Sequence, residues 1–220
     1  MSQDHFAAMR QSIVDGAPSL AAALAETVLQ AGADALEAID LGFVPGMHEV
    51  GEQFAQRKMF LPDMLASAEA MKAAMSVLEP ELKRQGSERP TLGTVLLGTT
   101  KGDIHEIGKT LVGTLLTAHG FRVYDLGVNV ASEQFAAKAR ELEADIVGVS
   151  ALLTTTMVSQ KTVVDVLTRE GLRPRVKIIV GGAPVTRHWA EQIGADGYGK
   201  DAMSAVALAK NLMEGSAARK

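Results

Sequence analysis

An aspartate, a histidine and a glycine at fixed spacing form the part of this chain best suited to metal chemistry. They are Asp103, His105 and Gly108, and they lie between an apolar run and a stretch with helical periodicity. An imidazole can bind a metal ion through one ring nitrogen, while a carboxylate holds the other ring N–H and fixes the tautomer. Glycine lets the backbone lie close to a bulky group. The pattern is that of a metal ligand, His105, with its orienting partner, Asp103, beside it.

Two further loops carry residues that could contact a ligand. Residues 150–157 contain the hydroxyl side chains of Ser150, Thr154, Thr155 and Thr156. Such hydroxyls are equally well explained as caps for the free N–H groups at a helix start. The glycine pair 181–182 follows another apolar run, where it indicates either a turn or a place where a large ligand lies against the backbone.

Alternating strands and helices after residue 90 must position these loops. Short apolar strands are predicted at 94–98, 122–126, 146–150, 177–180 and 195–198, and helices at 107–118, 132–143, 155–169, 186–193 and 201–213. This alternation predicts a five-stranded parallel sheet covered on both faces, in a flavodoxin-like or Rossmann-like α/β domain. Such sheets bind ligands at the carboxyl ends of the strands, where strand order reverses. The loop with Asp103 and His105 follows the first strand, so we expect it at that end.

The first part of the chain has helical periodicity throughout and predicts a separate domain. Asp34 is the expected cap of one helix, and Pro45 and Pro62 are expected near the starts of two others. About four helices are predicted, packed as an all-α bundle. The polar segment 79–90 carries two prolines and a glycine and is predicted to be a linker. We place the two domains at residues 1–88 and 89–220.

The composition of the 220-residue chain excludes several classes of protein. The net charge is −4, so no basic field indicates a nucleic-acid partner. The chain has no cysteine, which excludes disulfides, iron–sulfur clusters and cysteine-ligated zinc. No signal peptide is evident, and no apolar stretch approaches the roughly 18 residues of a transmembrane helix. We therefore expect a cytoplasmic protein without a membrane partner.

Taken together, the three loops resemble the successive signatures of the cobalamin-binding fold found in cobalamin-dependent methyltransferases and mutases. They are the stretch 102–108, the stretch 150–152 and the glycine pair 181–182, in the order of that family. The resemblance implies that His105 is the lower axial ligand of the cobalt, where it displaces the cofactor's dimethylbenzimidazole. Asp103 is then its hydrogen-bond partner, and these two residues are the functional core of the site.

The same resemblance assigns the other cofactor contacts. Residues implied to bind the corrinoid around the histidine are Gly102, Ile104, Glu106, Ile107 and Gly108. Residues implied to line or border the buried nucleotide tail are Ser150, Leu152, Thr154, Gly181, Gly182 and Gly199. Thr156 stands where some relatives have a serine that extends the His–Asp relay.

The helical half is similar to the cap module that precedes the corrinoid domain in methyltransferases. The similarity lies in residues 44–54, 59–62 and 67–72. In that module a phenylalanine and a leucine seven residues apart cover the upper face of the corrin, and Phe54 and Leu61 have this spacing. The alternative interpretation is that both side chains belong to the core of the bundle.

The resemblance implies a free-standing corrinoid protein of one-carbon metabolism rather than an enzyme that acts alone. Such a protein carries a methyl group on cobalt, alternating between cob(I)alamin and methylcobalamin. The implied partners are a substrate-specific methyltransferase, a second methyltransferase that serves tetrahydrofolate or a thiol, and a reductive activator. The segment 79–90 is then expected to act as the hinge that lets a partner move the cap.

Three other functions are compatible with parts of this sequence. An adenosylcobalamin sensor has a similar architecture but carries a tryptophan over the upper corrin face, whereas Trp189 lies in the second half of this chain. The small module of a cobalamin mutase lacks the helical first half. A receiver domain of flavodoxin-like fold needs an acidic cluster after the first strand, where this chain has a single aspartate. The sensor is kept as the alternative.

Overall fold

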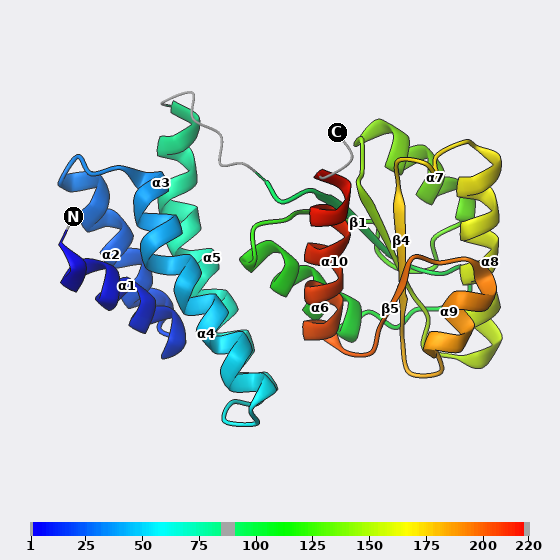
Figure 1. Ribbon diagram of the computed structural model, residues 1–220, viewed down its shortest axis with the longest axis horizontal. Coiled ribbons are helices and arrows are strands. Elements are labelled where there is room, and N and C mark those ends of the chain that lie inside the picture. Colours follow the sequence, from blue (N-terminus) through cyan, green and yellow to red (C-terminus); the bar gives the residue numbers. More distant parts are fainter. Residues whose placement is uncertain (1, 85–90, 218–220) are drawn as a thin grey trace. The chain divides into compact units, whose positions relative to one another are not determined.

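The computed structural model describes residues 2–84 and 91–217, and the chain divides into two compact units, Met1–Pro90 and Thr91–Lys220 (Figure 1). The boundary predicted between residues 88 and 89 lies outside the described residues. Each unit buries its own set of apolar side chains.

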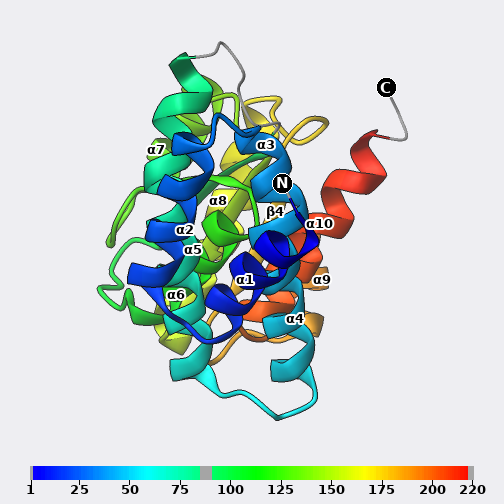
Figure 2. The ribbon, with the colours of Figure 1, turned by 90° about the vertical axis from the view of Figure 1, so that its left-hand side faces the viewer.

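The first unit is a bundle of helices. Its elements are α1 (Gln3–Val14), α2 (Pro18–Gln30), α3 (Ala35–Glu37), η1 (Ala38–Phe43), α4 (Val44–Ala55) and α5 (Leu61–Arg84). Because α3, the π-helical η1 and α4 follow one another without a break, the unit is the four-helix bundle that the sequence predicts (Figures 1 and 2). Large apolar side chains from all parts of the bundle fill its core, among them Met9, Val28, Phe43 and Met71.

The helix starts expected at Asp34 and Pro62 are confirmed. One carboxylate oxygen of Asp34 accepts the backbone N–H groups of Leu36 and Glu37, at 2.8 and 3.3 Å, and so caps α3. Pro62 lies in the first turn of α5, where its missing N–H costs no helical hydrogen bond.

The start expected near Pro45 is confirmed, since α4 begins at Val44 with the proline in its first turn, although the chain is already helical from Ala35 onward. The Val44 N–H bonds to the Ile39 carbonyl, five residues back, which is the wider spacing of a π-helix. The proline follows this widened turn, so its lack of an N–H donor does not end the helix.

The predicted linker at 79–90 is wrong for its first half. Helix α5 continues through Pro80 to Arg84, and the residues from 85 to 90 lie outside the described part. Leu78 and Leu82, four residues apart, are both buried, whereas Pro80 is exposed. Burial of this apolar stripe outweighs the hydrogen bond that the proline removes, because a carbonyl at the exposed side can bond to water instead.

The second unit is a five-stranded parallel sheet with helices on both faces, which confirms the predicted fold class. The strands are β1 (Thr94–Thr99), β2 (Arg122–Asp125), β3 (Ile146–Ser150), β4 (Lys177–Gly181) and β5 (Gly197–Gly199). The helices are α6 (Ile107–Ala118), α7 (Ser132–Glu141), α8 (Thr154–Arg169), α9 (Arg187–Ile193) and α10 (Ala202–Ala217). In Figure 1, α6 and α10 lie on one side of the sheet and α7, α8 and α9 on the other.

Strand order is β2-β1-β3-β4-β5, with every neighbouring pair parallel. The order reverses between β1 and β3, so the loops after these two strands flank the point where open α/β sheets bind their ligands. These are the loops that carry His105 and Ser150.

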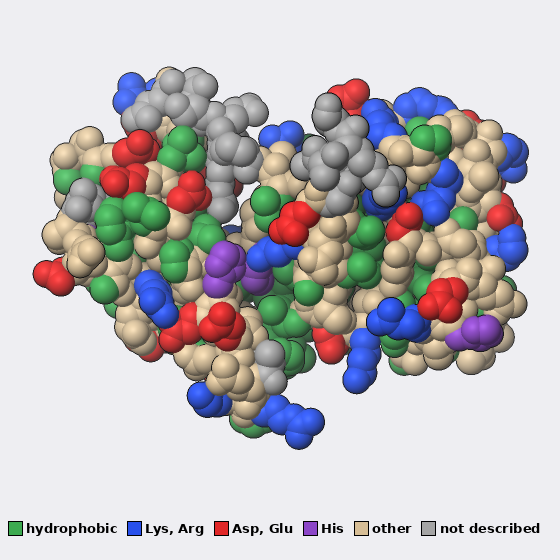
Figure 3. Space-filling view, viewed as in Figure 1, with side chains coloured by type: hydrophobic (Ala, Val, Ile, Leu, Met, Phe, Trp, Pro, Cys, Tyr) green, Lys and Arg blue, Asp and Glu red, His purple; other side chains and the backbone are tan. Residues whose placement is uncertain are grey.

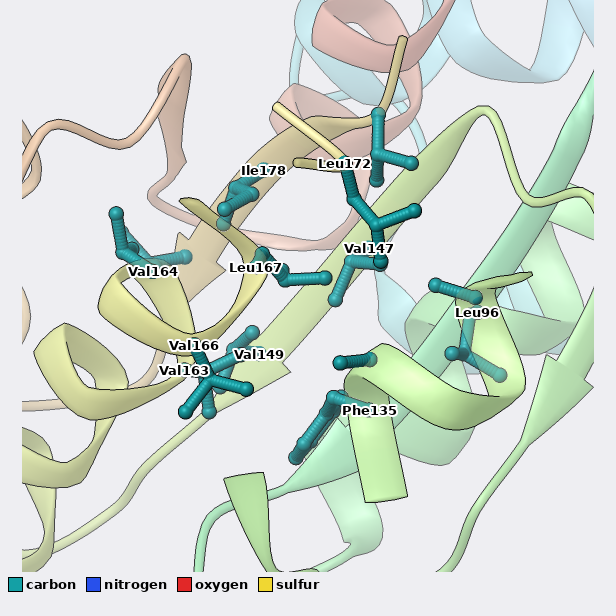
Figure 4. Packing of buried hydrophobic residues seen from close by; sticks show 14 of the residues in the cluster. Leu96, Phe135, Val147, Val149, Val163, Val164, Val166, Leu167, Leu172 and Ile178 are labelled. Atoms are coloured by element: carbon teal, nitrogen blue, oxygen red, sulfur yellow. The ribbon is translucent and has the colours of Figure 1, made fainter. Parts of the chain in front are cut away.

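The face of the sheet under α7, α8 and α9 is filled by large side chains (Figure 4). Leu96, Val147 and Ile178 stand in one row across β1, β3 and β4. Phe135 of α7 and Leu167 of α8 join the same core, and all five side chains are fully buried. Burial on both faces makes such strands read as continuous apolar runs, and this is why they could be predicted.

The described surface carries both signs of charge. Acidic and basic side chains are interspersed on the face of the molecule shown in Figure 3, so its described residues present no large field of one sign. Within residues 2–84 and 91–217, every helix is too short or too polar to cross a membrane.

Candidate functional site

A tight turn after β1 sets the direction of the candidate metal ligand. The Asp103 N–H donates to the Thr100 carbonyl at 3.1 Å, which closes a four-residue turn. Gly102 occupies the third position of this turn with φ +83°, a conformation that favours glycine. The chain leaves the turn directly into Asp103 and His105, at the carboxyl end of the sheet.

Asp103 is the centre of a chain of hydrogen bonds. One oxygen of its buried carboxylate accepts the His105 backbone N–H at 3.0 Å and lies 2.7 Å from His105 Nδ1. The other oxygen accepts the Leu152 N–H at 2.7 Å and the Thr156 hydroxyl at 2.6 Å. The carboxylate therefore joins the β1–α6 loop to the β3–α8 loop, and Thr156 extends the His105–Asp103 pair by one member.

The ionisation of Asp103 decides which nitrogen of His105 can bind a metal. Burial by itself raises the pKa of the carboxyl, but the hydrogen bonds from Thr156, Leu152 and His105 outweigh burial and hold the pKa well below its ordinary value. An ionised carboxylate only accepts hydrogen bonds, so Nδ1 of a neutral His105 ring carries the proton. Nε2 then has the free lone pair, and 46% of the side chain is exposed. His105 can ligate a metal through Nε2.

One histidine is not enough to hold a bare metal ion. Among the described residues, no group of three or more histidine, aspartate or glutamate side chains could bind one. The site suits a metal that brings most of its ligands in a macrocycle. Large apolar side chains beside the histidine fit such a group, since Ile104 and Ile107 are 74% and 88% exposed and Leu152 is exposed as well.

Three predicted binding residues from different strands stand in one row of the sheet. Ser150 is the register partner of Gly181, Gly181 is that of Gly199, and Thr99 of β1 completes the row. Register partners point to the same face, here the face under α10, since a Cβ on Gly199 would lie 2.9 Å from the Ala205 Cβ. The Thr99 hydroxyl donates to the His105 carbonyl at 3.0 Å, which ties this row of small residues to the metal-ligand loop.

The neighbouring row on this face is largely filled, because a Cβ on Gly148 would lie 2.5 Å from Leu97 Cδ2 and a Cβ on Gly197 2.5 Å from Leu208 Cδ2. It consists of Leu97, Gly148, Ile179 and Gly197. Although β3 is the central strand, both Gly148 and Ser150 are partly accessible. Central strands of parallel sheets are ordinarily buried on both faces. The sheet is therefore partly accessible at these two positions of β3, and least filled at the row with Ser150.

Gly182 and Gly108 of the predicted site are glycine for different structural reasons. Gly182 has φ +124°, and a Cβ there would lie 1.7 Å from the Ala151 carbonyl oxygen, so the chain's own packing requires glycine. Gly108 lies in the first turn of α6 without a positive φ, and a Cβ there would meet no described atom within 4 Å. Nothing in the described chain requires glycine at 108, which fits close approach by a bound group.

The remaining predicted residues of this unit flank the helix starts. Glu106 is exposed and immediately precedes α6, and Thr154 is exposed at the first position of α8. Helix α8 begins without a side-chain cap, and the Thr156 hydroxyl bonds to Asp103 instead. Capping is therefore the wrong explanation for Thr156.

Phe54 and Leu61 lie in the first unit, near the end of α4 and at the start of α5. Leu61 is exposed and Phe54 is partly exposed, so neither belongs to the buried core of the bundle. Phe60, next to Leu61, is exposed too. That the pair covers a ligand of the second unit stays a prediction.

Sequence reasoning missed two side chains that brace the ligand loop. The Asn129 side-chain oxygen accepts the Gly102 N–H at 2.8 Å from the neighbouring β2–α7 loop. Lys109 is buried and forms an ion pair with Asp125 at the end of β2, which anchors the first turn of α6. The lysine had a signal, because it is the one charged residue in the apolar stretch 107–118, whereas the asparagine had none.

A third missed side chain, Gln160, lies one turn after Thr156 on α8. It is fully buried, and its amide nitrogen donates to the carbonyls of Val149 and Gly181 at 2.9 and 3.1 Å. Its oxygen accepts the indole N–H of Trp189 at 3.0 Å. These bonds fix α8, and with it Thr156, against the strand ends.

Comparison with known proteins finds a family of the same description for each unit. The family described as "B12 binding domain" matches residues 93–207, and a second family of the same description matches residues 6–79. The chain is 49% identical to trimethylamine corrinoid protein 2 of Methanosarcina mazei over 212 residues, which cover 96% of this chain and 97% of that protein. It is 43% identical to a corrinoid protein of Desulfitobacterium hafniense, over 93% of this chain and 95% of that one.

Solved structures of cobalamin proteins also resemble this chain. The chain matches a component of the methanol:cobalamin methyltransferase complex MtaBC from Methanosarcina barkeri with a TM-score of 0.86 and 29% identity, covering 98% of this chain and 81% of that one. It also matches a cobalamin-binding protein from Desulfitobacterium hafniense with a TM-score of 0.76 and 33% identity, covering 94% and 98%.

Proposed function

The chain belongs to the B12-binding family of corrinoid proteins, and on this premise we propose that it carries a methyl group on the cobalt of a bound cobalamin between two methyltransferases. The hydrogen-bonded chain of Thr156, Asp103 and His105 is the observation that carries the proposal for this molecule. These hydrogen bonds leave Nε2 of the half-exposed His105 ring available to a metal. Among the described residues, no group of three or more histidine, aspartate or glutamate side chains could hold a bare metal ion.

In this proposal the chain's own residues bind and orient the cofactor, and the cobalamin, when bound, supplies the cobalt that accepts and releases the methyl group. His105 would ligate the cobalt through Nε2, while Asp103 and Thr156 hold the ring in the tautomer this requires. The nucleotide tail would lie along the row of small residues with Ser150, Gly181 and Gly199, in which Ser150 and Gly181 are partly accessible. Phe54 and Leu61 would shield the reactive face.

The methyl donor we propose is a methylated amine. Relatives with 46% to 49% identity carry the names trimethylamine or dimethylamine corrinoid protein. The methanol system supplies a less similar relative, at 29% identity.

The partners follow from the role of a carrier. A solved relative occurs in a complex with its methyltransferase, as the name methanol:cobalamin methyltransferase complex states. We propose a substrate-specific methyltransferase, an acceptor methyltransferase that serves tetrahydrofolate or a thiol, and a reductive activator that restores the cofactor after oxidation. A cytoplasmic location is part of the same proposal, and so is the inability of this chain to turn over a donor alone.

The alternative, an adenosylcobalamin sensor, has less support. The chain's single tryptophan, Trp189, lies on α9 in the second unit, and its indole N–H bonds to the buried Gln160. It packs against the core under α7, α8 and α9. The first unit therefore has no tryptophan to place over a corrin.

The cobalt ligand can be identified by electron paramagnetic resonance. Protein labelled with ¹⁵N-histidine is loaded with hydroxocobalamin and reduced to the paramagnetic cobalt(II) form. Ligation by His105 splits the signal into doublets, because ¹⁵N has spin one half, whereas the cofactor's own unlabelled benzimidazole gives triplets. We expect doublets for the native chain and for the exposed control His188→Ala, and their loss in His105→Ala. Triplets in the native chain would falsify the assignment.

The donor is tested by methyl transfer to the loaded, reduced protein. Trimethylamine, dimethylamine and methanol are each supplied with a matching methyltransferase, and methylcobalamin formation is followed by its absorption. We expect trimethylamine or dimethylamine to work only when the methyltransferase is present. If methanol with its methyltransferase forms methylcobalamin and neither amine does, the amine assignment is overturned. Turnover of any donor without a methyltransferase would make this chain the enzyme.

A further inference from the structure

Asn129 holds the backbone of the metal-ligand loop from outside that loop. Its side-chain oxygen accepts the Gly102 N–H at 2.8 Å, and its own backbone N–H donates to the Asp103 carbonyl at 2.9 Å. The two bonds enclose the dipeptide that leads into His105. Asn129, a residue of the β2–α7 loop, thus forms a hydrogen bond with each residue of this dipeptide.

The β2–α7 loop is itself hydrogen-bonded to β1, so the position of Asn129 is fixed. The Thr99 N–H donates to the Gly127 carbonyl at 3.0 Å, and the Val130 N–H donates to the Thr99 carbonyl at 2.9 Å. A parallel bridge joins Thr100 to Val130. Asn129 therefore stands at a set place relative to the end of β1, immediately beside the turn that starts at Thr100.

The backbone of Asn129 is shaped for this contact. Its φ is +54°, in the left-handed region that side chains other than asparagine, aspartate and glycine rarely adopt. Asparagine combines this conformation with an acceptor oxygen. Glycine would keep the conformation and lose the acceptor, and aspartate would keep both, so the chain offers a matched pair of variants.

Asp103 is held from two sides by different loops. The β3–α8 loop and α8 bind its carboxylate through Leu152 and Thr156, and the β2–α7 loop binds its backbone through Asn129. The direction of the His105 ring depends on both ends of Asp103, because the ring bonds to that carboxylate. A loose backbone would let the ring tilt even with the carboxylate in place.

We propose that Asn129 is a positioning residue for metal ligation by His105, acting through the backbone of Gly102 and Asp103. The proposal rests on the cobalt ligation proposed above for His105. It assigns to the β2–α7 loop a share in holding the cofactor, although that loop contributes no ligand itself.

The test is a double-mutant cycle on cobalamin release. Native protein, Asn129→Gly, Asn129→Asp, His105→Ala and the double variant Asn129→Gly/His105→Ala are loaded with hydroxocobalamin. Release is followed by the absorption of the cobalamin captured by excess affinity-tagged native apo-protein, which is separated from the untagged variant at each time point. Loss of one hydrogen bond should speed release about three- to ten-fold in Asn129→Gly, and Asn129→Asp should restore the native rate within about twofold.

The His105→Ala background separates positioning from a merely structural role. With the ligand gone, Asn129→Gly should not speed release further, because its effect passes through His105. An equal acceleration in both backgrounds would overturn the proposal, and so would an unchanged release rate in Asn129→Gly alone. Thermal unfolding of each apo-protein, expected within a few degrees of native, shows that every variant is folded.

Failure of the ligation proposal looks different. In that case His105→Ala itself releases cobalamin at the native rate, and the ¹⁵N-histidine doublets are missing from native protein. With doublets present and His105→Ala fast, only the behaviour of the Asn129 variants decides on this residue.

Discussion

The two faces of the sheet are built from the same strands but filled in opposite ways. Under α7, α8 and α9 the last full row is Gly98, Val149, Val180 and Tyr198. A Cβ on Gly98 would lie 2.5 Å from the Phe135 ring, so even the glycine of that row is covered. One residue further along each strand, on the opposite face, the row is Thr99, Ser150, Gly181 and Gly199.

The difference between the two faces indicates that one face stabilises the fold of this unit and the other binds the ligand. The closed face buries most of its large apolar side chains, and the buried amide of Gln160 has all its bonding partners within the chain. On the opposite face, called the open face, the last row has small side chains that bury little area by themselves. Substitutions on the closed face should therefore act on folding, and those on the open face should act on the ligand.

The largest expected effect is on the closed face. Phe135→Ala removes a fully buried ring from the core and should cost about 3–5 kcal/mol of unfolding free energy. Urea unfolding of the apo-protein measures it, with exposed Lys138→Ala on the same helix as a control within about 0.5 kcal/mol. Cobalamin affinity of the remaining folded protein should not change. A weaker affinity in folded Phe135→Ala would mean that the two faces are coupled.

A smaller effect, of the opposite kind, is expected on the open face. Ser150→Leu should fill the space beside Gly181 and reduce cobalamin affinity about a hundred-fold, from overpacking worth roughly 3 kcal/mol. Binding of cobinamide, which lacks the nucleotide tail, should be unchanged, and so should apo-protein stability. Ser150→Ala leaves the space free and serves as the control. Equal losses for cobalamin and cobinamide would contradict a tail-binding role for this row.

The smallest of the three expected effects is in the first unit, where the large apolar side chains of Phe54 and Leu61 are exposed or partly exposed. Replacing both Phe54 and Leu61 by alanine should lower the unfolding free energy by less than about 2 kcal/mol, because neither side chain is fully buried. The same change should speed photolysis of bound methylcobalamin, measured by the decay of its absorption under constant light. If instead the variant loses the several kcal/mol typical of buried side chains, the pair is core and not a cap.

Local sequence signals predicted the elements well. The strands and helices of the second unit lie within a few residues of their predicted bounds, because apolar runs and helical periodicity are properties of neighbouring residues. The predicted linker was wrong for residues 79–84. At Pro80 helix α5 continues, since burial of Leu78 and Leu82 outweighs the loss of one backbone hydrogen bond.

By itself, the sequence determined the fold class, the family resemblance and the pairing of His105 with Asp103, which lie two residues apart. Only the tertiary structure decided that the Thr156 hydroxyl, 53 residues later, bonds to Asp103, and that Asn129 holds the loop from a third direction. It also decided that Ser150, Gly181 and Gly199 share one row on the open face. The reason is physical: strand register and loop contacts join residues far apart in the chain, and no local pattern records which of them will meet.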